Sequence, residues 1–107
     1  MSRREKIEAM LADDPTDNFL RYSLAMELRS EGNNDRSLEV FADLTREDPP
    51  MVSAFFMAAQ QLAELDRVDE ARERLRVGIE QARKQGDAHA AAEMSEFLTS
   101  LGDLGEL

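Results

Sequence analysis

Few side chains in this sequence could do chemistry, and the single histidine is the first to consider. His89 lies four residues before Glu93, so a helix would place both on one face, where they could share a metal ion. Zinc sites use three or four protein ligands, and the sequence holds no cysteine and no second histidine. We therefore expect an exposed polar pair in the first turn of a helix, with no metal site and no catalytic residue.

The other charged residues form no recognisable site. An acidic cluster near the N-terminus lacks the spaced loop and the glycine of a calcium site: Glu5, Glu8, Asp13 and Asp14. No glycine-rich phosphate loop is present, so we expect no cofactor. Acidic and basic residues alternate along one later stretch, which predicts a solvated helix face with ion pairs. This stretch contains Glu70, Arg72, Glu73, Arg74, Arg76 and Glu80.

A stripe of large apolar side chains is the strongest candidate for binding. Phe19, Tyr22 and Met26 recur at spacings of three and four residues, so they share one face of a helix. The neighbouring face carries a core stripe of Leu24, Ala25 and Leu28. One helix is thus apolar around more than half of its circumference, and the second stripe must be either covered or exposed.

Three arrangements could account for this second stripe. The chain could cover it, either through an N-terminal helix that lays Ile7, Met10 and Leu11 over Phe19 or through packing between neighbouring helices. The stripe could instead be an exposed aromatic and methionine patch that takes an apolar helix or peptide. It could also be buried in a homodimer.

Composition favours an all-α protein in the cytoplasm. The chain has 107 residues, is rich in good helix formers, and contains few glycines and prolines. No run approaches the roughly 20 apolar residues that span a bilayer, and the first arginines are not followed by a secretory signal. The formal charge of -10 repels nucleic acid and anionic membranes, so we expect neither as a partner.

Turn and cap residues divide the chain into six expected helices. They lie near residues 2–13, 17–31, 35–47, 51–64, 67–84 and 87–101. Asp66 and Asp69 resemble a capping pair at the start of the fifth helix. Because the connections are short, neighbouring helices should form antiparallel hairpins.

The chain repeats itself after 34 residues. Size class and polarity mostly agree when Leu24 is aligned with Ala58, Ala25 with Ala59, Leu28 with Leu62, Gly32 with Asp66, Ser37 with Ala71, Phe41 with Leu75 and Leu44 with Gly78. The same shift aligns Ile7 with Phe41, Met10 with Leu44 and Pro15 with Pro49. Ala71 is small, so we expect two helices to cross closely there. We expect Leu75 to fill the gap one turn later.

The last helix follows a shift of 36 residues, which aligns Ala58 with Met94, Leu62 with Leu98 and Leu65 with Leu101. We therefore expect the connection before this helix to be two residues longer. The helix has no following partner and carries polar residues, so it should cap the array with one solvated side.

These offsets resemble the tetratricopeptide repeat family, and in particular its small bacterial members. The 34-residue helix–turn–helix period is the period of that family. The resemblance rests on Leu24, Ala25, Leu28, Gly32, Phe41 and Pro49 in the first unit and on Phe55, Ala58, Ala59, Leu62, Ala71 and Leu75 in the second. Arg21, Ser37, Gly78 and Arg83 depart from the family pattern.

The resemblance implies an all-α fold, a right-handed α-solenoid of antiparallel helix pairs. Residues 1–107 would form a single domain. It would consist of a half-unit helix at 1–16, repeats at 18–51 and 52–85, and a capping helix with a tail at 86–107.

The resemblance also implies binding rather than catalysis. In the family, the first helix of each unit lines a concave groove that receives a peptide or a partner helix. The matching positions here are Phe19, Tyr22, Met26, Arg29, Ser53, Phe56, Gln60, Ala63 and Glu64, followed on the cap by His89, Ala92 and Glu96. The polar end, Gln60, Glu64 and Glu96, suits a ligand with an apolar anchor and a basic residue. The alternative is a self-associating structural protein, a homodimer that buries the same patch.

Overall fold

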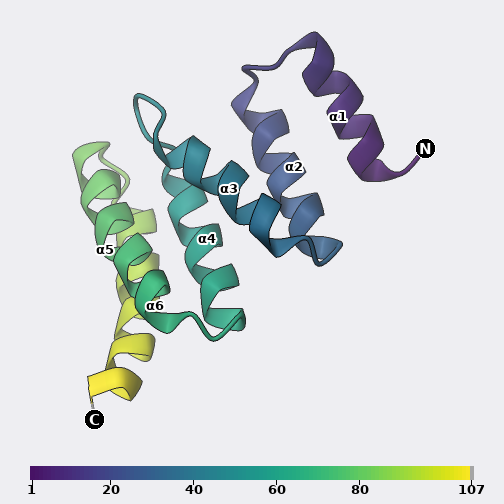
Figure 1. Ribbon diagram of the computed structural model, residues 1–107. Helices are drawn as coiled ribbons and strands as arrows, with labels where there is room; N and C mark the ends of the chain where they lie inside the picture. Colours follow the sequence, from purple (N-terminus) through teal and green to yellow (C-terminus); the bar gives the residue numbers. More distant parts are fainter. Residues whose placement is uncertain (107) are drawn as a thin grey trace.

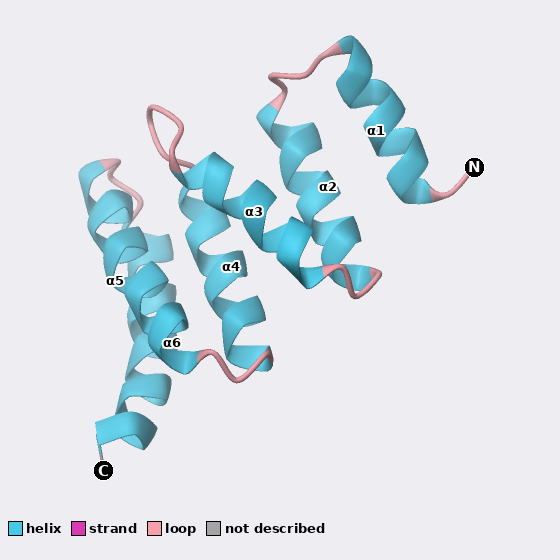
Figure 2. Ribbon diagram, in the orientation of Figure 1, coloured by secondary structure: helices cyan, strands magenta, loops and turns pink. Residues whose placement is uncertain are grey.

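The structure is a computed structural model that describes the backbone of residues 1–106 and the side chains of residues 1–102 (Figure 1). It consists of α1 (Arg3–Asp13), α2 (Asn18–Ser30), α3 (Asn34–Thr45), α4 (Val52–Glu64), α5 (Val68–Lys84) and α6 (Ala88–Glu106). The six expected helices are confirmed, although α6 runs beyond its expected end at residue 101. Short loops join the helices, and residues 1–106 contain no strand (Figure 2). The end of the expected tail, residue 107, lies outside the described residues.

The helices form an elongated array that measures 47 × 30 × 18 Å. Each helix packs against the next one in the chain, and α4 also contacts α6 (Figure 1). The first helices of successive pairs, α2, α4 and α6, therefore form one layer, and α3 and α5 lie in the other. The expected all-α solenoid of helix pairs is confirmed.

Three helices end in the same tight turn, which directs the chain into the next helix. The turn residues Gly32, Asp66 and Gly86 have positive φ angles of 81°, 62° and 76°. After each of them, a backbone N–H returns to a carbonyl in the last turn of the helix, at 2.9 Å from Asn33 to Leu28, 2.8 Å from Arg67 to Leu62 and 2.8 Å from Asp87 to Ala82. This is the Schellman ending, which satisfies carbonyls that a helix leaves unpaired.

The expected capping pair of Asp66 and Asp69 is wrong. Asp66 belongs to the turn that ends α4, and the residue that precedes α5 is Arg67, whose side chain makes no capping hydrogen bond. The pattern was misleading because Asp serves both as a helix cap and as a residue that tolerates the left-handed conformation.

The expected longer connection before the last helix is also wrong. Residues 85–87 join α5 to α6, whereas the longer segment 46–51 joins α3 to α4. The difference lies in the helices, because α5 has 17 residues and α3 has 12. The paired prolines at 49 and 50 cannot continue a helix. In α5, by contrast, Ile79 and Ala82 extend the buried stripe for another turn and a half.

The close helix crossing expected around α5 is present. Ala71 and Leu75 are completely buried in the core that α4, α5 and α6 share. Gly78 marks an even closer approach, since a Cβ atom there would lie 2.7 Å from the Cβ of Phe55 and 2.8 Å from the sulfur of Met94. Only glycine lets α5 approach both neighbours this closely.

The N-terminal helix does not cover Phe19. Ile7 of α1 is buried against Leu24 and Leu28 instead, while Met10 remains 52% exposed and Phe19 74% exposed. The first of the three arrangements considered for the apolar stripe, cover by α1, is therefore wrong for Phe19.

A polar cluster lies inside the core, at a position where the sequence departs from the family pattern. Ser37 is completely buried, and its hydroxyl is 2.7 Å from the carbonyl of Ala25 and 3.2 Å from Oε1 of Gln61. The Gln61 amide, also buried, donates to the Asn34 side chain at 2.9 Å. These hydrogen bonds join α2, α3 and α4. They also give the buried polar groups the partners that such groups need.

Candidate binding groove

The expected groove begins on α2, where the apolar stripe surrounds an open hollow. Phe19 stands out with 74% of its surface exposed, while Tyr22 and Met26 are half-buried. The hollow measures about 390 Å³ and is lined by Arg3, Phe19, Tyr22, Ser23, Met26 and Glu27. Ser23 and Glu27 were not among the expected groove residues, although their spacing of four and eight residues from Phe19 places them beside the same stripe.

Tyr22 and Met26 serve both the groove and the core. The Tyr22 ring meets the buried Phe41 ring edge to face, with centroids 5.8 Å apart. Both Tyr22 and Met26 pack against the cluster that contains Ala25 and Ala54. Partial burial raises the pKa of the Tyr22 hydroxyl, and nearby Arg29 opposes that rise. Packing against α3 and α4 therefore covers one side of this stripe and leaves Phe19 outside.

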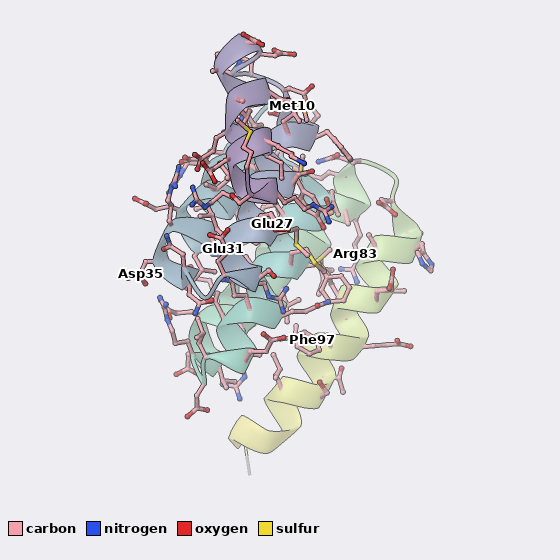
Figure 3. The ribbon with its side chains drawn as sticks, turned by 90° about the vertical axis from the view of Figure 1, so that its right-hand side faces the viewer. Met10, Glu27, Glu31, Asp35, Arg83 and Phe97 are labelled. Atoms are coloured by element: carbon pink, nitrogen blue, oxygen red, sulfur yellow. The ribbon has the colours of Figure 1, made fainter. Side chains whose placement is uncertain are left out.

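The next part of the groove lies on α4. Ser53 is exposed, and Phe56, Gln60 and Ala63 are half-buried. The Phe56 ring contacts Phe97 of α6, with ring centroids 6.0 Å apart. Figure 3 shows Phe97 pointing from α6 toward the earlier helices. Phe56 thus helps to fasten the capping helix to the array and is only partly available to a ligand.

Arg29 and Glu64 are brought together by the fold. The guanidinium of Arg29 on α2 donates to the Glu64 carboxylate on α4 at 2.6 Å, with 18% and 64% of the two side chains exposed. This pair links two lining helices across the groove. Glu64 was expected to face a basic ligand, but its carboxylate already pairs with Arg29.

The capping helix contributes exposed polar residues. His89, Ala92 and Glu96 are exposed, and His89 lies 2.9 Å from Glu93. Among the residues that the structure describes, no group of three or more His, Cys, Asp or Glu could hold a metal ion. None of the described helices is both long and apolar enough to cross a membrane.

One arginine of the alternating stretch on α5 is mostly covered rather than solvated, contrary to expectation. The Arg72 side chain is only 12% exposed, and it donates to the Leu101 carbonyl of α6 at 2.8 Å and to Asp69 at 2.6 Å. It therefore joins α5 to the capping helix. Charge alternation alone could not distinguish this residue from its solvated neighbours.

The family of the chain follows from three comparisons. A model of the tetratricopeptide repeat family matches residues 28–103. The solution NMR structure of a tetratricopeptide repeat domain protein from Salinibacter ruber is similar, with 32% identity, a TM-score of 0.78, and coverage of 84% of this chain and 91% of that one. A crystal structure of a tetratricopeptide repeat domain protein from the same organism, also 32% identical, has a TM-score of 0.73 and covers 82% of this chain and 99% of that one.

The fold is shared more widely. A solution structure of a protein from Bordetella parapertussis, 24% identical, has a TM-score of 0.81 and covers 96% of this chain and 90% of that one. Among curated proteins none matches the chain. The family model and the Salinibacter ruber structures show that the chain belongs to the tetratricopeptide repeat family.

Proposed function

We propose that the chain is a non-catalytic binding module that takes a peptide or a helix of another protein in the groove of α2, α4 and α6. Tetratricopeptide repeats are in general protein–protein interaction modules, and proteins of this family are typically non-catalytic scaffolds. The observation that carries the proposal is Phe19, a large aromatic side chain left 74% exposed at a hollow that Tyr22 and Met26 also line.

The chemistry of the groove suggests the ligand. Phe19, Tyr22 and Met26 offer apolar contact at one end, where aromatic and methionine side chains adapt to an apolar anchor. At the other end, Glu96 is exposed on α6. The Arg29–Glu64 pair lies between the two ends and neutralises the middle of the groove. A ligand with an apolar anchor followed by a lysine or arginine matches this order.

The test is peptide selection from a displayed library against the full chain, followed by affinity measurements on the enriched peptides. Phe19→Ser should weaken binding at least tenfold, about 1.4 kcal/mol, because it removes an exposed contact and little packing. Val77→Ser is the matched control, since Val77 is 42% exposed on α5 in the other layer. Equal affinity for the wild type and for Phe19→Ser would contradict the proposal.

Phe19 is a sharper test position than Tyr22 or Phe56. Tyr22→Ala and Phe56→Ala would also remove ring contacts with Phe41 and Phe97, so loss of binding could follow from loosened packing. The molecular mass in solution distinguishes a module that binds another protein from the self-associating alternative. A species heavier than the 12.1 kDa monomer that Phe19→Ser dissociates would show that a second copy occupies the groove.

A further inference from the structure

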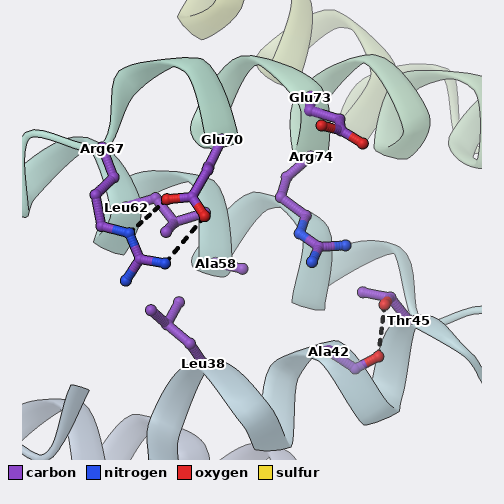
Figure 4. A pocket seen from close by; sticks show the side chains of 9 residues that line it. All are labelled: Leu38, Ala42, Thr45, Ala58, Leu62, Arg67, Glu70, Glu73 and Arg74. Atoms are coloured by element: carbon purple, nitrogen blue, oxygen red, sulfur yellow. Dashed lines mark hydrogen bonds and ion pairs between the residues drawn. The ribbon is translucent and has the colours of Figure 1, made fainter. Parts of the chain in front are cut away.

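A second depression lies in the other layer, between α3 and α5. It is a cleft of about 150 Å³, and the side chains that line it are drawn in Figure 4. Leu38 and Ala42 of α3 and Ala58 and Leu62 of α4 supply apolar surface. The remaining lining residues are Thr45, Arg67, Glu70, Glu73 and Arg74. None of these residues belongs to the proposed groove.

The internal repeat provides a reference for this cleft. Shifted back by 34 residues, its lining falls on the gap between α1 and α3. The changes that alter volume or charge there are Arg4 to Leu38, Glu8 to Ala42, Leu11 to Thr45, Leu24 to Ala58, Asn33 to Arg67, Arg36 to Glu70 and Val40 to Arg74.

The gap between α1 and α3 is filled. Leu24 is buried in it together with Ile7 and Leu28, and Leu11 and Val40 pack against them. Two ion pairs close its outer side, because the Glu8 carboxylate lies 3.2 Å from both Arg4 and Arg36. In the equivalent gap between α3 and α5, alanine and threonine replace Leu24 and Leu11, and Leu38 is the one large apolar side chain gained there, at the position of Arg4.

A cation faces the open gap. The Arg67 guanidinium pairs with Glu70 through two hydrogen bonds, one of them 3.0 Å long (Figure 4). Arg74 lies across the cleft from this pair, near Thr45, and makes no ion pair or hydrogen bond with the described side chains. Arg74 replaces Val40 of the filled gap, so a guanidinium stands where the other repeat has an apolar filler. The hydrogen bonds with Arg67 lower the pKa of the Glu70 carboxyl group, and the charge of Arg74 adds to that effect. Guanidinium groups bind carboxylates in a two-pronged geometry.

We propose that the cleft between α3 and α5 binds a peptide C-terminus whose last residue is apolar. A volume of about 150 Å³ holds one benzene-sized group, so the cleft has room for a single side chain against Leu38, Ala58 and Leu62. Arg74 lines the same small cavity. The apolar group in the cleft and the carboxylate that Arg74 would bind must therefore belong to one residue. Within a peptide, the last residue is the one that joins an apolar side chain to a main-chain carboxylate. Glu73 at the rim disfavours a second acidic group on the residue before it.

The test is an NMR titration of the ¹⁵N-labelled chain with N-acetyl-leucine as the probe and N-acetyl-leucinamide as its uncharged match. We expect saturable shifts in the amide signals of Leu38, Ala42, Ala58 and Leu62 with the acid, and at least fivefold weaker binding of the amide. Arg74→Val introduces the valine that the filled gap has at the equivalent position. It should weaken binding of the acid to the level of the amide.

Ala58→Leu installs the filler of the other repeat and should abolish the shifts. Arg74 is exposed, so Arg74→Val keeps the fold and decides the outcome even where Ala58→Leu perturbs the core. Phe19→Ser should leave the titration unchanged, which separates this cleft from the proposed groove. Absent shifts, equal binding of acid and amide, or unchanged binding to Arg74→Val would each overturn the proposal.

Discussion

The gap between α1 and α3 and the gap between α3 and α5 occupy equivalent positions 34 residues apart, yet only the first is filled. Other contacts hold the helices on either side of each gap. Around α2, α3 and α4 these include the buried Ala25, Phe41 and Leu44, and around α4 and α5 they include Ala59, Ala71 and Leu75. The comparison shows that a repeat can keep its helix packing while one face changes from filled core to open cleft, because each helix packs mainly on its neighbours.

The largest expected effect comes from opening the filled gap. Leu24→Ala gives the first repeat the residue of the second, and we expect it to lower the free energy of unfolding by about 3 kcal/mol. Leu24 is 7% exposed and fastens α1 to the array through Ile7 and Leu28. Urea unfolding followed by circular dichroism measures the change. A loss below about 1 kcal/mol would mean that α1 contributes little to stability.

A second comparison concerns the close crossing at Gly78, which is aligned with Leu44 of the first repeat. Gly78→Ala should destabilise the chain by about 2 kcal/mol, since the added methyl meets Phe55 and Met94 below 3 Å and overpacking exceeds the gain in helix propensity. Gly102→Ala in α6 is the control, because its methyl would meet nothing within 4 Å. Thermal unfolding of both variants tests this. Stabilisation by Gly78→Ala would show that the helices can separate freely.

Filling the open gap should raise the free energy of unfolding, the opposite of the effect of Leu24→Ala. Ala58→Leu buries additional carbon atoms in the cleft, and we expect it to stabilise the chain by about 1 kcal/mol. The measurement is urea unfolding beside the Leu24→Ala variant, which makes the reciprocal exchange. Destabilisation would indicate that α3 and α5 are held too closely for a leucine, and that the two gaps differ in helix spacing as well as in filling.

The smallest effect concerns the turns. Asp66→Gly gives the turn between α4 and α5 the glycine that Gly32 provides in the first repeat. Glycine adopts the left-handed conformation without the strain that a Cβ atom causes. The substitution should therefore raise the free energy of unfolding by roughly 0.5 kcal/mol. The midpoint of thermal unfolding detects a change of this size, with Gly32→Asp as the reverse exchange. A fall in stability on Asp66→Gly would show that the Asp66 side chain stabilises the turn.

Much of the fold was predictable from local patterns. The turn residues Gly32, Asp66 and Gly86 and the prolines at 49 and 50 mark the helix ends, and the 34-residue offset matches core positions such as Leu28 and Leu62. The division into units at 18–51 and 52–85 stays a prediction. The helix expected at 67–84 agrees with α5 to within one residue, whereas α6 runs to Glu106, beyond its expected end at residue 101.

The candidate site was less predictable. The sequence identified the stripe of Phe19, Tyr22 and Met26, but helical spacing cannot tell which of them faces solvent. The fold decides this, since Phe41 covers one side of Tyr22 and leaves Phe19 exposed. In the same way, Arg29 and Glu64 lie 35 residues apart in the sequence, and only the packing of α2 beside α4 makes them an ion pair.

The sequence by itself therefore determined the helices, their pairing, the repeat and its family, because these depend on propensity, turn chemistry and hydrophobic period within neighbouring segments. The tertiary structure alone decided which apolar side chains remain exposed, that Arg29 pairs with Glu64, that Arg72 donates to the Leu101 carbonyl, and that the gap beside Ala58 is open. Those features depend on distances between side chains from different helices, and such distances are set when the helices pack.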